Sequence, residues 1–414
     1  MEIFAASYVV PMGSPAIEGG AIAVADGRVV AVDTLAKLRS AYGCTVTDFP
    51  GCAIMPGLVN AHTHLELTHF PSWKLRKGID YSPRTYVDWV IQVIKVKRGL
   101  TRDELEMSIK EGIRIALESG TTAVGDILTD RNLVSCHAGG GLGGRLYFEA
   151  IGHDEGRCST LLAELRHALD IFPSGRLKPG LSPHAPHTLS SRFMADVTDL
   201  AGSHALPTMV HLAESREESA FFHDSSGNIA ELLYPFAGWD AHVPHPLRTT
   251  PTAYLDSLGA LRRDTSVVHC VHVTPDDVSI LKSRGVAAIL CPRSNDRLVV
   301  GKAPAALLKK SGIPLALGTD SLASNDSLSL WDEMRFLRQE FPAVFTPTEI
   351  LEMVTTGAAR AIRREDELGS LAIGKLADFL VVRPGEGVTL PELSEALIER
   401  SELLEVFVAG KQLP

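Results

Sequence analysis

The chain lacks several features that mark particular classes of protein. No apolar run approaches the roughly 20 residues that a membrane-spanning helix needs. None of the 6 cysteines forms a Cys-x-x-Cys pair, which argues against a structural zinc site. Positive charge is in deficit, with 40 Lys and Arg against 50 Asp and Glu and a formal net charge of -10. Nucleic acid is therefore disfavoured as a partner, because its phosphates require a basic surface.

Targeting and repetition signals are also scarce. Residues 1–10 lack the basic start and the sustained apolar core of a signal peptide. There is no low-complexity tract, and the composition, 45% hydrophobic and 22% charged, is that of an ordinary globular protein. We therefore predict a reduced, cytoplasmic protein that acts on a small molecule, binds neither nucleic acid nor membrane, and could form a homo-oligomer.

Both ends of the chain favour β structure. Segments 21–25 and 28–32 flank Asp26-Gly27, the residue pair that a two-residue hairpin prefers. Compact apolar runs return at 379–382 and 404–408. We predict a small composite β-sandwich domain built from residues 1–56 and 367–414.

The intervening residues 57–366 show one pattern eight times: an apolar strand that ends in polar or small residues, often followed by a helical stretch. The clearest helix begins at a capping box, Thr101 with Glu104, and stops at Gly120. Eight such units predict an α/β protein with a (β/α)8 barrel of the TIM type. The predicted strands are 57–60, 121–126, 145–151, 178–182, 207–211, 266–269, 286–291 and 314–318.

Histidines and acids collect at the C-terminal ends of these strands, where barrel enzymes keep their active sites. A lone His-x-His among 15 histidines could arise by chance. However, His62 and His64 follow the first strand, His211 ends the fifth, His269 ends the sixth, and Asp320 follows the eighth. A buried acid requires a partner. Three neutral imidazoles and one carboxylate suit zinc or ferrous iron with a position left for water.

These segments resemble the motifs of the amidohydrolase superfamily. Residues 55–64, MPGLVNAHTH, resemble its opening motif. The later motifs are matched in order by 210–214 (VHLAE), 268–272 (VHCVH) and 317–321 (LGTDS), and residues 368–378 resemble the return into the composite β domain. The resemblance therefore extends over nearly the whole chain, and it is greatest to the branch of cytosine deaminases and chlorohydrolases.

The resemblance assigns roles to individual residues. It makes His62, His64, His211 and Asp320 the ligands of a single divalent metal, zinc first and ferrous iron second. Binuclear relatives carry a carboxylated lysine at the end of strand four, whereas Lys178 lies at the other end of that strand here. The resemblance further implies three catalytic residues, namely Glu214 as general acid and base, His269 beside the attacking water, and Asp320.

The sequence says less about which residues contact the substrate than about the metal ligands. His184 matches a histidine that contacts substrate in some relatives, and His187 is the alternative. Arg293, Ser294 and Asn295 follow the seventh strand and are candidate substrate contacts. Several further residues are more typical of packing or of the protein surface than of a functional site. Glu66, Trp73, Arg76, Tyr86 and Trp89 lie in a segment that could form a lid but are individually typical of packing or surface; Lys95, Lys97 and Arg98 are typical of a solvated helix face; and Cys270 is typical of an inert core thiol.

The predicted function is hydrolytic deamination of an aminated heterocycle of the adenine type. Residues 62–66 and 291–295 resemble aminodeoxyfutalosine deaminases, which favours 6-aminodeoxyfutalosine, a substrate of menaquinone biosynthesis. Its benzoate would require a cation and an apolar wall. Deamination of adenosylhomocysteine, methylthioadenosine or another aminopurine remains open, as does removal of a chloride or opening of a cyclic amide. A non-catalytic scaffold is disfavoured because all four ligands and Glu214 are present. The candidates for the cation are Arg76, Arg145 and Arg293, and those for the wall are Trp73, Tyr86 and Trp89.

Overall fold

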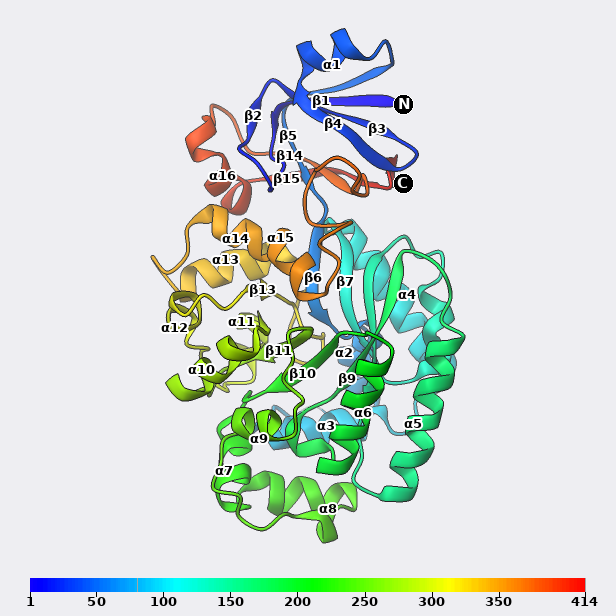
Figure 1. Ribbon diagram of the computed structural model, residues 1–414, viewed down its shortest axis with the longest axis vertical. Helices are drawn as coiled ribbons and strands as arrows, with labels where there is room; N and C mark the ends of the chain where they lie inside the picture. The colour runs from blue at the N-terminus through cyan, green and yellow to red at the C-terminus, as the bar shows by residue number, and fades with distance from the viewer. Residues whose placement is uncertain (80, 414) are drawn as a thin grey trace.

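The computed structural model describes residues 1–79 and 81–413, and its main element is a parallel barrel (Figure 1). Eight strands follow one another in spatial order as they do in sequence, and each coincides with a predicted segment. A single bridge between Thr63 and Asp320 joins the first strand to the residues after the last. The predicted (β/α)8 barrel is therefore confirmed. Its strands are β6 (Leu58–Thr63), β7 (Thr121–Leu128), β8 (Gly143–Ala150), β9 (Leu177–Pro183), β10 (Thr208–Leu212), β11 (Thr265–His269), β12 (Ala287–Leu290) and β13 (Leu315–Leu317).

Helices surround the barrel. The predicted capping box is present, since the side chains of Thr101 and Glu104 bond to each other's backbone N–H groups at the start of α4. Two helices, α2 and α3, lie in the long connection after β6. The α-helices along the barrel are α2 (Phe70–Arg76), α3 (Tyr86–Lys97), α4 (Arg102–Glu118), α5 (Glu155–Asp170), α6 (Ser191–Ser203), α7 (Arg216–Asp224), α8 (Tyr234–Ala237), α9 (Pro251–Ser257), α10 (Pro275–Arg284), α11 (Pro292–Arg297), α12 (Ala305–Lys310), α13 (Leu330–Glu340), α14 (Pro347–Met353) and α15 (Thr356–Ala361).

A second, mixed sheet combines strands from both ends of the chain, which confirms the predicted composite unit. It curls on itself: the Phe4 ring lies 5.1 Å from that of Phe407, although two strands separate β1 from β15. Phe379 stacks on Phe407 at 4.3 Å. One curved sheet thus encloses its own aromatic core. In spatial order its strands are β16 (Lys411–Gln412), β15 (Glu402–Val408), β14 (Phe379–Arg383), β5 (Val46–Pro56), β1 (Glu2–Val9), β3 (Gly20–Ala25) and β4 (Arg28–Thr34); β2 (Ile17–Glu18) pairs with β1, and the helices of this part are α1 (Leu35–Ala41) and α16 (Leu393–Glu399).

The two sheets follow one another along the long axis of the molecule (Figure 1). Because β5 leads directly into β6, the barrel strands begin beside the small sheet and end at the far end, near α3, α7 and α8. The strand ends that carry His62, His211 and His269 therefore open away from the small sheet. Among the described residues, no helix is long and apolar enough to cross a membrane.

Candidate active site

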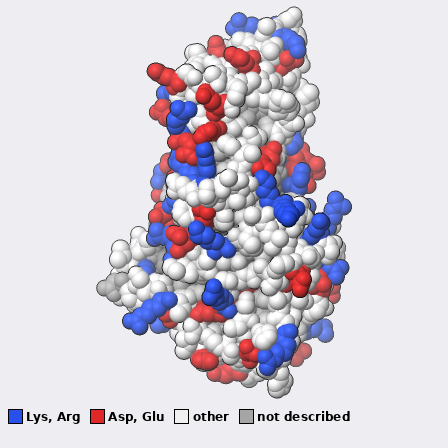
Figure 2. All heavy atoms as spheres, turned by 90° about the vertical axis from the view of Figure 1, so that its left-hand side faces the viewer, with Lys and Arg blue, Asp and Glu red and all other residues white. Residues whose placement is uncertain are grey.

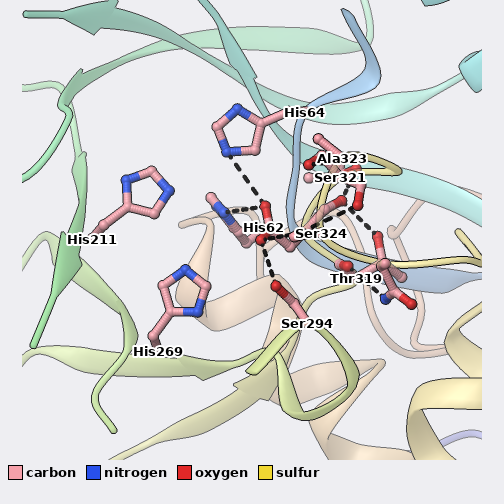
Figure 3. A network of polar contacts seen from close by, with 12 residues as sticks. His62, His64, His211, His269, Ser294, Thr319, Ser321, Ala323 and Ser324 are labelled. Atoms are coloured by element: carbon pink, nitrogen blue, oxygen red, sulfur yellow. Dashed lines mark hydrogen bonds and ion pairs between the residues drawn. The ribbon is translucent and has the colours of Figure 1, made fainter. Parts of the chain in front are cut away.

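Three histidines converge at the C-terminal ends of the barrel strands (Figure 3). His62 and His64 stand two residues apart at the end of β6, and His211 lies near the end of β10 on another part of the barrel wall. One ring nitrogen of each lies within 4.8 Å of one from each of the others. This spacing allows all three imidazoles to contact one ion.

Asp320 approaches the same point from the end of β13. Its Oδ1 lies 3.6 Å from Nε2 of both His62 and His64. Its Oδ2 accepts hydrogen bonds from the hydroxyls of Ser294, at 2.8 Å, and Ser324, at 2.6 Å. Burial opposes ionisation of Asp320, but these neighbouring imidazoles more than offset it and hold its pKa well below the usual range.

Burial favours the neutral form of the imidazoles, and a hydrogen bond orients that of His211. Burial lowers the pKa of His62 and lowers that of His211 to about 4. The Nδ1 of His211 lies 2.8 Å from the backbone carbonyl oxygen of His184, so Nδ1 carries the proton and Nε2 keeps its lone pair. The Nε2 of His62 is buried and has no hydrogen-bond partner. A buried polar atom normally has one. The residues therefore fit a divalent metal: an unpartnered lone pair, two further imidazoles and a carboxylate face the same point.

Glu214 is a buried acid that follows β10. Its Oε2 accepts a hydrogen bond of 3.0 Å from the Tyr86 hydroxyl and lies 3.7 Å from Nε2 of His269. Its Oε1 is buried without a partner. Burial and the charge of Asp320 raise the pKa of Glu214 well above its usual value, and the Tyr86 bond opposes the shift. A carboxyl group can both accept and return a proton, and the raised pKa favours the protonated form.

The backbone turns sharply where the strands end. His269, Asp320 and Ala213 have φ values of 71°, 56° and 50°, in the left-handed region that side chains rarely adopt. Gly318 lets β13 approach β6, since a Cβ there would lie 2.7 Å from the His62 carbonyl oxygen. Both features bring side chains from separate strands to one point.

A cavity of 940 Å³ opens above the cluster. His184 lines it, whereas His187 is buried behind it and accepts a hydrogen bond from Tyr234 through its carbonyl. His184 is thus the histidine that faces the cavity. Tyr86, Trp89, His153 and Trp239 form aromatic parts of its wall, and Lys97, Arg98 and Arg157 supply positive charge.

Comparison with known proteins agrees with this geometry. The profile of the amidohydrolase family matches residues 53–413. The chain belongs to the amidohydrolase family. It is a hydrolase acting on carbon–nitrogen bonds other than peptide bonds.

Two curated relatives of this amidohydrolase carry deaminase names. An aminodeoxyfutalosine deaminase of Deinococcus radiodurans is 31% identical over 85% of this chain and 83% of its own length. A 5-methylthioadenosine/S-adenosylhomocysteine deaminase of Nitratidesulfovibrio vulgaris is also 31% identical, over 88% and 79%.

Two solved structures share the fold of the amidohydrolase. An adenosine deaminase from Xanthomonas campestris with bound zinc is 25% identical, with a TM-score of 0.78 over 99% of this chain and 92% of that one. The Helicobacter pylori aminofutalosine deaminase in complex with methylthio-coformycin has a TM-score of 0.88 over all of both chains and is 22% identical. The second comparison therefore concerns the fold alone.

Four sequence-based assignments require correction in this amidohydrolase. Arg145 lies near the start of β8, at the end of the barrel opposite the cavity, and its guanidinium donates to the carbonyls of Ile362, Pro179 and Arg363. Arg293 pairs with Asp326 outside the cavity wall. Arg76 pairs with Glu104 at the surface, and Trp73 is buried away from the cavity. None of these four lines the cavity.

Two other predicted contacts lie one layer behind the site. Ser294 donates to Asp320, and the amide oxygen of Asn295 lies 3.0 Å from Nδ1 of His269. Both are buried and do not line the cavity, so their position suits them to orient those two side chains. Cys270 is buried with a raised pKa, as expected for an inert thiol.

A buried polar network forms another wall of the cavity and was not predicted from the sequence. Lys97 pairs with Glu66 at 2.6 Å, and the Thr129 hydroxyl lies 2.7 Å from both Glu66 Oε1 and Glu149 Oε2. Glu149 Oε1 lies 3.9 Å from Nε2 of His184. The sequence predicts Lys97 on a solvated helix face, because the basic run 95–98 does not indicate which of its residues faces the cavity.

Proposed function

We propose that the chain is a metal-dependent hydrolytic deaminase of an adenine-type nucleoside, with 6-aminodeoxyfutalosine as the specific substrate. The observation that carries this proposal is the placement of Glu214. Its carboxyl group is buried, has a raised pKa and an unpartnered Oε1, and stands between the histidine cluster and the cavity. An amidine-type ring carbon that is to lose its amino group requires a proton donor and acceptor at this place.

The proposed ligands are His62, His64, His211 and Asp320, holding one divalent ion. Neutral imidazoles with one carboxylate suit zinc, and ferrous iron is the alternative. Lys178 is exposed at the start of β9 and is not near the cluster, which supports a mononuclear site. When bound, the ion lowers the pKa of its water toward about 7 and so supplies a nucleophile.

The chain's own residues perform the remaining steps. Asp320 and His269 accept hydrogen bonds from the attacking water and aim it at the ring carbon that bears the amino group. Glu214 takes the proton of the water at Oε1 and passes it to the neighbouring ring nitrogen, which removes charge from the attacked carbon. The second proton of the water passes from the new hydroxyl group through Glu214 to the amino nitrogen. The C–N bond then breaks, ammonia leaves, and the C=O bond of the product forms. Tyr86 holds the Glu214 carboxyl group in place throughout.

The size and charge of the cavity support a nucleoside with a carboxylate-bearing arm. A volume of 940 Å³ exceeds what a purine base alone requires. The corrected cations for the benzoate are Arg98 and Arg157, which line the cavity, in place of Arg76, Arg145 and Arg293. Arginine binds carboxylates in a bidentate manner. Trp89 and Trp239 supply an apolar wall.

The decisive measurement is kcat/KM for four nucleosides under one set of conditions: aminodeoxyfutalosine, adenosine, methylthioadenosine and adenosylhomocysteine. We expect aminodeoxyfutalosine to be the fastest. A tenfold advantage for methylthioadenosine or adenosylhomocysteine, about 1.4 kcal/mol in transition-state binding, would reassign the enzyme to the activity named for the second relative. If all four nucleosides are inert while a chlorinated triazine or a cyclic amide reacts, the proposal of an adenine-type substrate is wrong.

A further inference from the structure

A second hollow, of 410 Å³, lies at the opposite end of the barrel from the active-site cavity. Val286, directly before β12, and Pro314, directly before β13, form part of its wall, so it opens beside the N-terminal ends of these strands. Arg360, near the C-terminal end of α15, and Arg363, just after it, line the same wall. None of the residues assigned to the active site contributes to this hollow.

Positive charge predominates around this hollow. Arg263, Lys282, Arg360 and Arg363 line it, and Glu365 is the single acidic residue among its lining residues, for a formal sum of +3 from four cations and one anion. Across the part of the chain that the structure describes, none of the four cations forms an ion pair within 4.0 Å. Their mutual repulsion is therefore offset only in part, by the single carboxylate of Glu365.

Arg363 forms the inner part of this cluster. Its side chain is half-buried, and both Nε and Nη2 are shielded from solvent without a hydrogen-bond partner. A buried donor left unpaired is costly, more so in a charged group. The remaining nitrogen, Nη1, has no partner among the described residues either. Arginine is suited to such a position only if an acceptor with several oxygens faces it.

We propose that this hollow is a binding site for a small phosphate-class oxyanion, either inorganic phosphate or the phosphate group of a monoester. Four cations from three segments of the chain line one hollow, which suits a compact anion with several acceptor oxygens. A nucleic acid backbone is disfavoured: the molecule carries a net charge of -10, and basic and acidic side chains are interspersed over the face that bears α10 and α12 (Figure 2).

The test is calorimetric titration and thermal unfolding of the metal-loaded enzyme with sodium phosphate, against sodium chloride of equal ionic strength. We expect phosphate to bind and to raise Tm with increasing concentration, whereas chloride does neither. Arg360→Gln and Lys282→Gln, both at exposed side chains, should each raise Kd for phosphate several-fold. Arg363→Gln should raise it tenfold or more. Arg39→Gln, at an exposed cation of α1 outside the hollow, is the matched control.

Each result has a defined meaning. If Arg360→Gln and Lys282→Gln bind phosphate as the wild type does, the anion binds elsewhere and the proposal is wrong, whether or not Arg363→Gln folds. Absence of any phosphate-specific effect on the wild type also overturns it. Glycerol phosphate distinguishes the two sources: tighter binding than inorganic phosphate indicates a phosphate monoester site, and weaker binding indicates a site for the free ion. Neither result depends on deaminase activity.

Discussion

Tyr86 donates a hydrogen bond to Glu214 and thereby stabilises the ionised carboxylate. In Tyr86→Phe this bond is lost, so the pKa of Glu214 should rise further. We expect the acidic limb of kcat/KM against pH to move upward by about one unit, because a hydrogen bond to a charged group contributes about 1.5 kcal/mol or more. Tyr42→Phe, in the small sheet part, should leave the profile unchanged. An unmoved limb in Tyr86→Phe would show that Glu214 does not govern it.

Glu214 itself is tested by Glu214→Gln. The amide keeps the shape of the side chain but cannot carry a proton, so kcat should fall by about 10²–10⁴-fold while metal content stays the same. Glu231→Gln, at an exposed residue of the next segment, is the control. Activity close to that of the wild type in clean Glu214→Gln protein would remove this residue from the mechanism.

Glu333 makes stability depend on pH. Burial raises its pKa to about 8, although Asn325 donates a hydrogen bond of 2.7 Å to it. A carboxyl group whose folded pKa lies above its unfolded value stabilises the fold while protonated, and this contribution is lost as pH rises from about 4.5 to about 8. Wild-type Tm should therefore fall across this range more steeply than the Tm of Glu333→Gln, as measured by thermal unfolding. Parallel curves would contradict the assigned shift.

At the scale of elements, the proposed ligands come from strands on different parts of the barrel. An ion held by His62 and His64 of β6 and by His211 of β10 would link strands that three others separate. We expect about one metal per chain by elemental analysis, and a Tm about 5 °C lower after chelation. His211→Ala should abolish the difference, while His223→Ala, exposed on α7, should keep it. Two metals per chain with Lys178 carboxylated would contradict the mononuclear site.

The elements were more predictable from sequence than the contacts between them. Eight apolar runs separated by helical segments define the barrel, and side chains at strand ends must meet at its rim, which is why His62, His211 and Asp320 were identified. Arg145 does not follow this rule, because it lies near the start of its strand and not at the end that faces the cavity. The sequence does not predict that Lys97 and Arg157 line the cavity. The reason is that the position of a helix relative to the barrel rim cannot be inferred from the strand that precedes it.

At the scale of the molecule, the small sheet is stabilised by its stacked aromatic rings. Phe407→Ala should cost about 3–5 kcal/mol in the free energy of unfolding of this part. The predicted division into 1–56 with 367–414 and 57–366 places all 4 tryptophans in the barrel. If that division holds, far-ultraviolet circular dichroism of the variant should begin to change at lower denaturant concentration than tryptophan fluorescence. Coincident transitions would instead show one cooperative unit. Leu232→Ala, at an exposed side chain, is the control.

The bridge between Thr63 and Asp320 joins residues 257 positions apart in sequence. During synthesis on the ribosome, His62, His64 and His211 leave the exit tunnel well before Asp320 does. A nascent chain therefore contains the three histidines before Asp320 has been added. The barrel is then still open between β6 and the residues that follow β13. The complete proposed ligand set comes into existence at the same moment as the closed barrel. A chain truncated before residue 320 lacks both Asp320 and this bridge, so we expect unfinished products of translation to be inactive.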